Sequence, residues 1–146
     1  MITHFFVPGI PKGQPRVKAC IRGKHAGVYD PGTADGWKAA VADTWRIILN
    51  KVEHTNPVSL ELTFYFPRPK NHYGSGKNSG VMKESAPERH TSKPDADNLA
   101  KAVMDVLTRL GAWTDDVLVW DLSVKRRWNT ENVHQQKSGC LVTIQS

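Results

Sequence analysis

The sequence has few cysteines and no long apolar run. Its 146 residues include only two cysteines, Cys20 and Cys140, which are too few for a disulfide framework or a four-cysteine zinc site. No apolar stretch approaches the roughly 18 residues of a membrane span, and the N-terminus has neither the basic start nor the apolar core of a signal peptide. We therefore expect a reduced, cytoplasmic protein with no membrane contact.

Acidic residues are absent from one part of the chain and crowded into another. Residues 1–29 carry five lysines and arginines and no acid, whereas six of the fourteen acids are aspartates between positions 95 and 121. The whole chain has a net charge of +6, and a basic domain of this kind often binds a polyanion. Carboxylates concentrated in one short stretch of a basic protein indicate a functional site.

Hydrophobic periodicity predicts a single α+β domain over residues 1–146, in which a mixed β-sheet packs with two main helices. The expected order is β-(β)-α-β-α-β-β. Three- and four-residue spacing predicts the helices at about 33–52 and 95–110, and Gly111 is placed to end the second one. The expected strands are at 2–7, 58–66, 117–128 and 140–144, with a further short strand near 16–21.

A long basic loop is expected at about 67–94. This segment is rich in proline, glycine, serine, asparagine and lysine, has no periodicity, and carries six basic residues against two acidic ones. A loop of this length in a compact domain is usually functional or disordered. Because it leads directly into the aspartate-rich stretch, we favour a functional loop, which either contacts the ligand or serves as a structural lid.

The segment from Lys93 to Lys101 carries the most chemical information. Asp95 is placed to cap the second helix, and Asp97 and Lys101 follow on the face opposite its apolar stripe. The pair Asp115-Asp116 precedes the next strand. If that strand packs beside the start of the helix, three or four carboxylates converge, and a divalent cation such as Mg²⁺ or Mn²⁺ relieves their repulsion. Such a site favours metal-assisted phosphodiester hydrolysis, with Lys101 stabilising charge on the phosphate.

Each of these residues also has a purely structural interpretation. Asp95 alone reads as a helix cap, Asp97 and Lys101 as an exposed ion pair, and Asp115-Asp116 as a turn. Asp105 lies one helical turn beyond Lys101 and is expected to pair with it. From spacing alone, the metal site and these structural roles remain equally open.

Two stretches resemble the RusA family of Holliday junction resolvases. One is the run from Lys93 to Leu107, followed by Asp115-Asp116 and a valine-rich strand ending in Lys125; the other is the opening segment 7–16. The resemblance implies a small homodimeric endonuclease, often prophage-encoded, acting in a bacterial or phage-infected cell. It implies that the enzyme needs Mg²⁺, for which Mn²⁺ is a possible substitute, and that it nicks four-way DNA junctions symmetrically in recombination and repair.

The resemblance also assigns roles to individual residues. It implies that Asp95, Asp97, Asp116 and Lys101 are catalytic, and that Asp95, Asp97 and Asp116 hold the metal with support from Asp115. The basic residues expected to contact DNA phosphates are Lys12, Arg16, Arg89, Lys93, Lys125, Arg126 and Arg127.

Two other functions remain as alternatives. One is a module that binds branched DNA and has lost catalysis; the other is a nuclease that cuts flaps or replication forks. The presence of all four expected catalytic positions favours an active enzyme.

Overall fold

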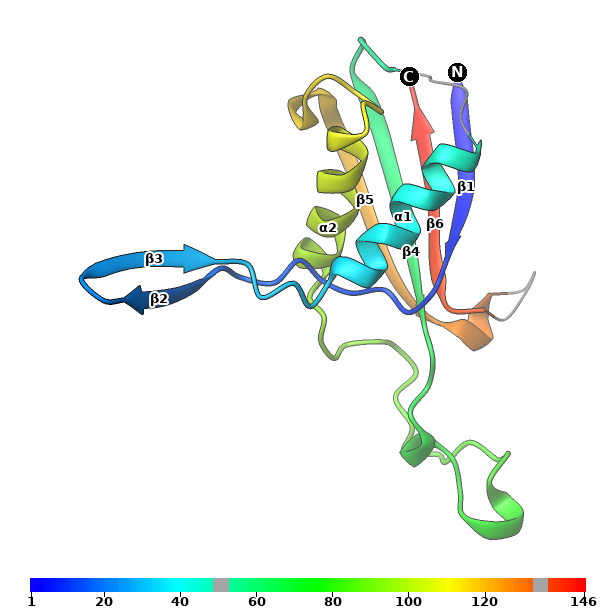
Figure 1. Ribbon diagram of the computed structural model, residues 1–146. Helices are drawn as coiled ribbons and strands as arrows, with labels where there is room; N and C mark the ends of the chain where they lie inside the picture. Colours follow the sequence, from blue (N-terminus) through cyan, green and yellow to red (C-terminus); the bar gives the residue numbers. More distant parts are fainter. Residues whose placement is uncertain (49–52, 133–136) are drawn as a thin grey trace.

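A computed structural model describes residues 1–48, 53–132 and 137–146. These residues form two α-helices, a four-stranded sheet and a separate two-stranded ribbon (Figure 1). The elements are β1 (Ile2–Pro8), β2 (Lys18–Arg22), β3 (His25–Tyr29), α1 (Asp35–Ile48), β4 (Val58–Phe66), α2 (Ala96–Arg109), β5 (Val119–Trp128) and β6 (Gly139–Gln145), with short 3-10 turns between some of them. The predicted α+β class is confirmed. None of the described helices is long and apolar enough to cross a membrane.

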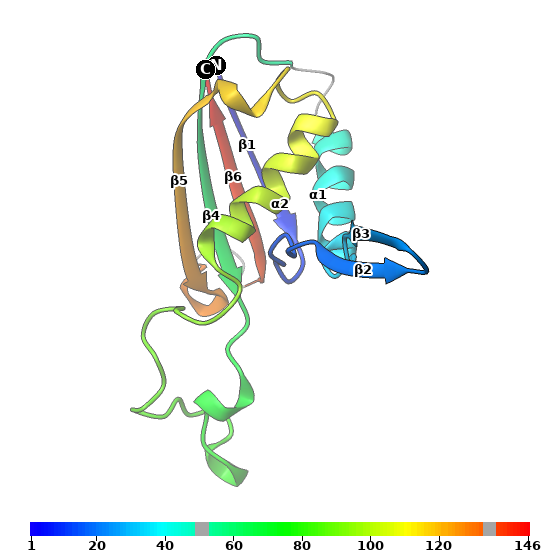
Figure 2. The same cartoon turned by 90° about the vertical axis from the view of Figure 1, so that its left-hand side faces the viewer.

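The main sheet is mixed, as predicted, with the strand order β1-β6-β4-β5. β4 and β5 run parallel, and β6 pairs antiparallel with both β4 and β1. A parallel pair requires a crossover connection, which α2 provides. Figure 2 shows that α1 and α2 both cover the same face of the sheet.

Strand alternation places the core between this face and the helices. In β4, Val58, Leu60, Leu62 and Phe64 are fully buried, whereas the intervening Glu61 is exposed. Because successive side chains of a strand point to opposite faces, one register sends every apolar residue of β4 toward the helices. The β5 residues that share this face are therefore Leu122, Val124, Arg126 and Trp128, the partners of Leu60, Leu62, Phe64 and Phe66.

Helix α2 buries one stripe and ends where glycine permits it. Leu99, Val103, Val106 and Leu107 are buried on this stripe. Gly111 has φ +76°, and the amides of Gly111 and Ala112 donate to the carbonyls of Thr108 and Leu107. These two hydrogen bonds require a left-handed backbone at position 111, which glycine adopts most readily. The predicted end of the helix at Gly111 is therefore confirmed.

The predicted elements differ from the structure in two places. The region 8–32 contains two strands rather than the one expected, because His25–Tyr29 pairs with Lys18–Arg22 through a turn at Gly23. The second strand was missed because none of its side chains is buried, so no core-facing pattern marks it. The strand expected from 117 begins at Val119, after a 3-10 turn. The end of the first helix beyond 48 lies outside the described residues.

The segment 67–94, which connects β4 to α2, contains no α-helix and none of the named strands. It contains two short 3-10 turns, at Lys70–His72 and Gly76–Asn78, and extends away from the end of the sheet where β4 finishes (Figure 1). Its return path leads to the N-terminus of α2.

The buried stripe of α2 yields a stability prediction. Truncating Leu107, which is fully buried, to alanine removes apolar contacts and leaves a cavity. We expect Leu107→Ala to lower the free energy of unfolding by about 2–5 kcal/mol, measured by urea denaturation. The control is Ile47→Ala on α1, where the side chain is 84% exposed; it should change stability by less than about 0.5 kcal/mol. Equal losses would contradict the assigned core.

Candidate active site

A shallow cavity of about 250 Å³ lies between α2 and β5. Its polar lining consists of Asp97, Lys101 and Asp105 from α2 and Asp116 from the 3-10 turn before β5. Its apolar lining consists of Ala96, Ala100, Met104, Leu122 and Val124. We call this cavity the α2–β5 groove. It brings together three of the four residues expected to be catalytic.

The charged side chains of α2 that line this groove form no ion pairs with one another. Asp97 and Lys101 are exposed, and Asp105 is half-buried. Within the described ranges, Lys101 forms no ion pair within 4 Å with either Asp97 or Asp105, so the pairing expected of Lys101 and Asp105 does not occur. The three side chains therefore line the groove with polar atoms that no ion pair engages.

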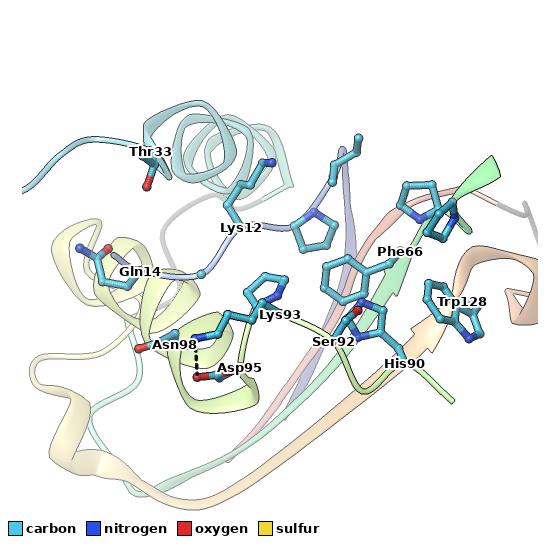
Figure 3. A pocket seen from close by; sticks show the side chains of 16 residues that line it. Lys12, Gln14, Thr33, Phe66, His90, Ser92, Lys93, Asp95, Asn98 and Trp128 are labelled. Carbon is cyan, nitrogen blue, oxygen red and sulfur yellow. Dashed lines mark ion pairs between the residues drawn. The ribbon is translucent and has the colours of Figure 1, made fainter. Parts of the chain in front are cut away.

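Asp95 occupies the N-cap position of α2 but does not cap it with its side chain. Its backbone is extended, with φ −72° and ψ 152°, and its carboxylate accepts no hydrogen bond from the first turn. The cap predicted for this carboxylate is therefore wrong, although the position is right. Its Oδ2 atom instead lies 3.9 Å from Nζ of Lys93 (Figure 3). The Asp95 carboxylate thus remains exposed beside a cation.

Asp115 and Asp116 have different surroundings. Oδ1 of Asp115 accepts a hydrogen bond of 2.9 Å from the amide of Val117 and so caps the 3-10 turn Asp116–Leu118. Asp116 follows directly and lines the α2–β5 groove. Asp115 therefore stabilises the turn that presents Asp116.

The carboxylates of the groove are chemically suited to a hard divalent cation, but the described side chains do not form a compact ligand set. Asp97, Asp105 and Asp116 offer carboxylate oxygens, the donors that Mg²⁺ and Mn²⁺ prefer. Across residues 1–48, 53–132 and 137–146, no three histidine, cysteine, aspartate or glutamate side chains are close enough to form a ligand set. The carboxylates are spread along the groove, as mutual repulsion favours.

A second, larger cavity of about 550 Å³ lies on the other side of the α2 N-terminus. Asp95, Lys93 and Asn98 line it on one side, and Lys12 faces them from the segment after β1 (Figure 3). Two expected phosphate-contacting cations, Lys12 and Lys93, are therefore brought beside Asp95.

One arginine of β5 fixes the segment that presents Asp95. Nη1 of Arg126 donates to the carbonyl oxygens of Ser92 at 3.0 Å and Pro94 at 3.2 Å. We expected Arg126 to contact DNA, and sequence reasoning missed this contact because it joins a strand to an irregular loop. Arg126 thereby ties the chain just before Asp95 to the main sheet.

An aromatic cluster holds the same end of the loop. The His90 ring stacks on Phe66, with centroids 4.1 Å apart, and lies edge-on to Trp128 at 4.8 Å. Arg68 covers the Trp128 ring at 4.7 Å, and its guanidinium donates to the carbonyl of Pro87. Burial of the imidazole, and secondarily the charge of Arg126, lower the pKa of His90 from its usual value of 6.5.

The remaining expected DNA contacts do not share one surface. Arg89, Arg126 and Arg127 line a small cavity of about 150 Å³. Lys125 lies on the sheet face that the helices leave open and pairs with Glu61 at 3.3 Å. Arg16 is exposed just before the β2–β3 ribbon.

Comparisons with known proteins identify the family of the chain. The family model described as Endodeoxyribonuclease RusA matches residues 8–144. The chain is also 35% identical, over 130 residues, to "Uncharacterized protein YqaN" of Bacillus subtilis (strain 168), and the match covers 87% of this chain and 88% of that protein. This family model covers nearly the whole chain, so the α+β domain is a nuclease domain. The chain belongs to the RusA family of endodeoxyribonucleases, the enzymes that resolve crossover junctions.

Removing the Arg126 contacts should loosen the loop before Asp95. We expect Arg126→Gln to speed tryptic cleavage after Arg89 by at least about tenfold, because a hydrogen bond to a charged group contributes about 1.5–3 kcal/mol and its loss makes local opening of the loop easier. Limited proteolysis followed by mass spectrometry measures the rate. The neighbouring variant Arg127→Gln, which removes the same charge, should be cleaved like the parent. Equal rates for the parent and Arg126→Gln would contradict the positioning role.

The lowered pKa of His90 predicts a loss of stability in acid. Below about pH 6.5 the unfolded chain binds a proton at this histidine that the folded chain does not, so stability falls as the pH decreases toward the folded pKa. We expect His90→Phe, compared with the parent by urea denaturation at pH 7.5 and 5.5, to lose less stability over this range. Burial also lowers the pKa of His54, so part of the pH dependence of stability remains in this variant. The control His25→Gln changes an exposed histidine and should behave like the parent. The same loss in parent and His90→Phe would refute this assignment.

Proposed function

We propose that this protein is a Mg²⁺-dependent, structure-selective endonuclease that resolves Holliday junctions by paired symmetric nicks in DNA recombination and repair. The observation that supports this proposal most strongly is the α2–β5 groove, where Asp97, Lys101 and Asp116 line one cavity in a chain of the RusA family. The exposed position of the groove suits a substrate as large as duplex DNA.

The proposed metal ligands are Asp97 and Asp116, with Asp95 from the adjoining N-cap position. Asp115 supports them by capping the turn that carries Asp116. Bound at these carboxylates, Mg²⁺ or Mn²⁺ would supply an activated water and neutralise charge on the cleaved phosphate. Asp105, which also lines the groove, is a further carboxylate in reach of this site and was expected only to have a structural role.

Lys101 is proposed to act on the phosphate. It lies one helical turn from Asp97 on the same edge of α2, and no described carboxylate within 4 Å neutralises it. A cation that is free of an ion pair can stabilise the negative charge that grows on the phosphate oxygens during cleavage. Lys12 and Lys93, beside Asp95 in the larger cavity, are suited to hold the neighbouring phosphates.

The proposed enzyme acts as a homodimer. One chain carries one α2–β5 groove, and resolution requires a nick in each of two strands. A two-fold dimer presents two identical sites to a substrate with two-fold symmetry. A bacterial cytoplasm, with the gene carried by a prophage, is the setting that the family resemblance suggests.

The direct test removes one metal-ligating charge. We expect Asp97→Asn to reduce junction cleavage in Mg²⁺ by at least about 1000-fold, equivalent to about 4 kcal/mol of transition-state stabilisation, while binding in EDTA stays equal to the parent or becomes tighter. Cleavage is followed on a four-way junction with each strand labelled in turn, and a linear duplex serves as the negative substrate. Asp43→Asn, an equally conservative change on α1, should cut like the parent.

Other outcomes separate the alternatives. Tight junction binding without cleavage in Mg²⁺ or Mn²⁺ would identify a binding module. Faster cleavage of flaps or forks than of four-way junctions would identify a different branched substrate. Full activity of Asp97→Asn would refute the assigned site.

A further inference from the structure

The β2–β3 ribbon stands outside the folded body of the protein. It projects sideways from the sheet and helices in both views (Figures 1 and 2). All five residues of β3 are exposed, and in β2 only Cys20 is half-buried. A two-stranded ribbon by itself is at best marginally stable in water, so this one is suited to contact something beyond the described chain.

The strand register gives the ribbon two chemically different faces. Lys18 pairs with Tyr29, Cys20 with Gly27, and Arg22 with His25, so these six residues, five of which carry a side chain, share one face. The opposite face holds two apolar pairs, Ala19 with Val28 and Ile21 with Ala26. We call them the cationic face and the apolar face. Lys24 at the turn and Arg16 at the base extend the positive charge along the ribbon.

The positive charge of the cationic face favours an anionic partner such as DNA. The stretch from Arg16 to Tyr29 contains four lysines and arginines and no acid, so nothing within the ribbon neutralises it. Each strand of the ribbon has five residues and is therefore about 17 Å long at roughly 3.3 Å per residue. A two-stranded ribbon fits the DNA major groove, which is about 12 Å wide and is bordered by phosphates.

The base of the ribbon is fastened to the candidate active site. The amide of Gln14 donates to the carbonyl of Asn98 at 2.8 Å, in the first turn of α2. The Gln14 side chain donates to Asp30, directly after β3, at 2.9 Å, and the other oxygen of Asp30 accepts from the amide of Gly32 at 2.8 Å. These two hydrogen bonds, the Gly32 contact first, lower the pKa of Asp30. Gln14 thus joins the segments entering and leaving the ribbon to the helix that carries Asp97.

The entering segment also packs tightly where it passes α2. A Cβ atom on Gly13 would lie 3.0 Å from Cβ of Pro94 and 3.1 Å from Cβ of Asn98. This close approach favours glycine and holds the entering chain against the turn that presents Asp95. The position of the ribbon is therefore set relative to the α2–β5 groove.

We propose that the β2–β3 ribbon is a DNA-binding arm whose cationic face lies along one duplex arm of the substrate, with Lys18, Arg22 and Lys24 contacting phosphates. The inference rests on the proposed function and adds the surface that orients the duplex relative to the groove. It assigns a role to three cations that were not among the expected DNA contacts.

The test compares variants of the two faces. The cationic-face variant Lys18→Gln/Arg22→Gln removes two charges, and the matched control Arg46→Gln/Arg109→Gln removes two from the last turns of α1 and α2. The apolar-face variant is Ile21→Thr/Val28→Thr, which keeps β-branched residues in the strands. Junction affinity is measured in EDTA as a function of salt, so that binding is separated from cleavage, and thermal unfolding confirms that each variant folds.

The arm predicts a specific binding result. Loss of two phosphate contacts lowers the slope of log affinity against log salt by about 2, and the affinity at 0.1 M salt falls by at least about tenfold. The matched control keeps the affinity and slope of the parent. Parent-like binding by the cationic-face variant would overturn the proposal. Weaker binding by the apolar-face variant alone, together with dissociation of a dimer, would overturn it in favour of a contact with a second copy of the chain.

A second measurement locates the arm on DNA. Cys20 lies on the cationic face, and Cys140 is fully buried, so a thiol-directed aryl azide labels Cys20 selectively. Illumination of the labelled protein bound to a junction should cross-link it to one duplex arm, and Cys20→Ser should give no cross-link. A bound complex without cross-links would overturn the proposal.

Failure of the arm and failure of the proposed function give different results. A parent protein that binds DNA but does not cut it would refute the proposed nuclease activity. Comparing the cationic-face and apolar-face variants would still test whether the ribbon binds DNA. A parent protein that binds no DNA would refute both.

Discussion

The packing of α2 on the main sheet is the constraint on which the candidate active site depends. Leu99, Val103, Val106 and Leu107 must be buried together, and this burial fixes the rotation of the helix about its axis. Because a helix repeats every 3.6 residues, Asp97, Lys101 and Asp105 then share one edge. That edge borders β5, and the α2–β5 groove follows from it.

The parallel pairing of β4 with β5 supplies the other wall. The chain leaves β4, crosses in α2 and enters β5 beside β4, so Asp116 in the turn before β5 reaches the helix that carries Asp97. The cap that Asp115 places on the intervening turn fixes this entry. Two acids separated by nineteen positions in the sequence therefore line one cavity for reasons of chain topology.

Contacts from irregular segments meet at the first turn of α2. Arg126 ties down the chain before Asp95 from one side, and Gln14 binds Asn98 from the other. Gly13 allows the two segments to approach closely. Lys12, Lys93 and Asp95 are consequently grouped around one cavity (Figure 3). These contacts hold the end of α2 that carries the proposed metal ligands Asp95 and Asp97.

Periodic features were predictable from the sequence, and contacts between irregular segments were not. The alternation in 58–66 and the spacing from Leu99 to Leu107 located β4 and α2 because burial imposes those periods. The strand His25–Tyr29 and the hydrogen bonds of Arg126 lack such a signal, since the first faces solvent and the second joins distant residues. Asp105 could have been assigned to the groove from its spacing to Asp97 and Lys101, which places all three on one helix edge.

The proposed function requires the carboxylates of the α2–β5 groove to hold the catalytic metal. Crystals grown with Mn²⁺, with diffraction collected at the manganese absorption edge, test it most directly. We expect an anomalous peak between the side chains of Asp97 and Asp116, within coordination distance of both. A manganese site elsewhere in a protein that cleaves junctions in Mn²⁺, with Asp97 and Asp116 unliganded, would contradict it.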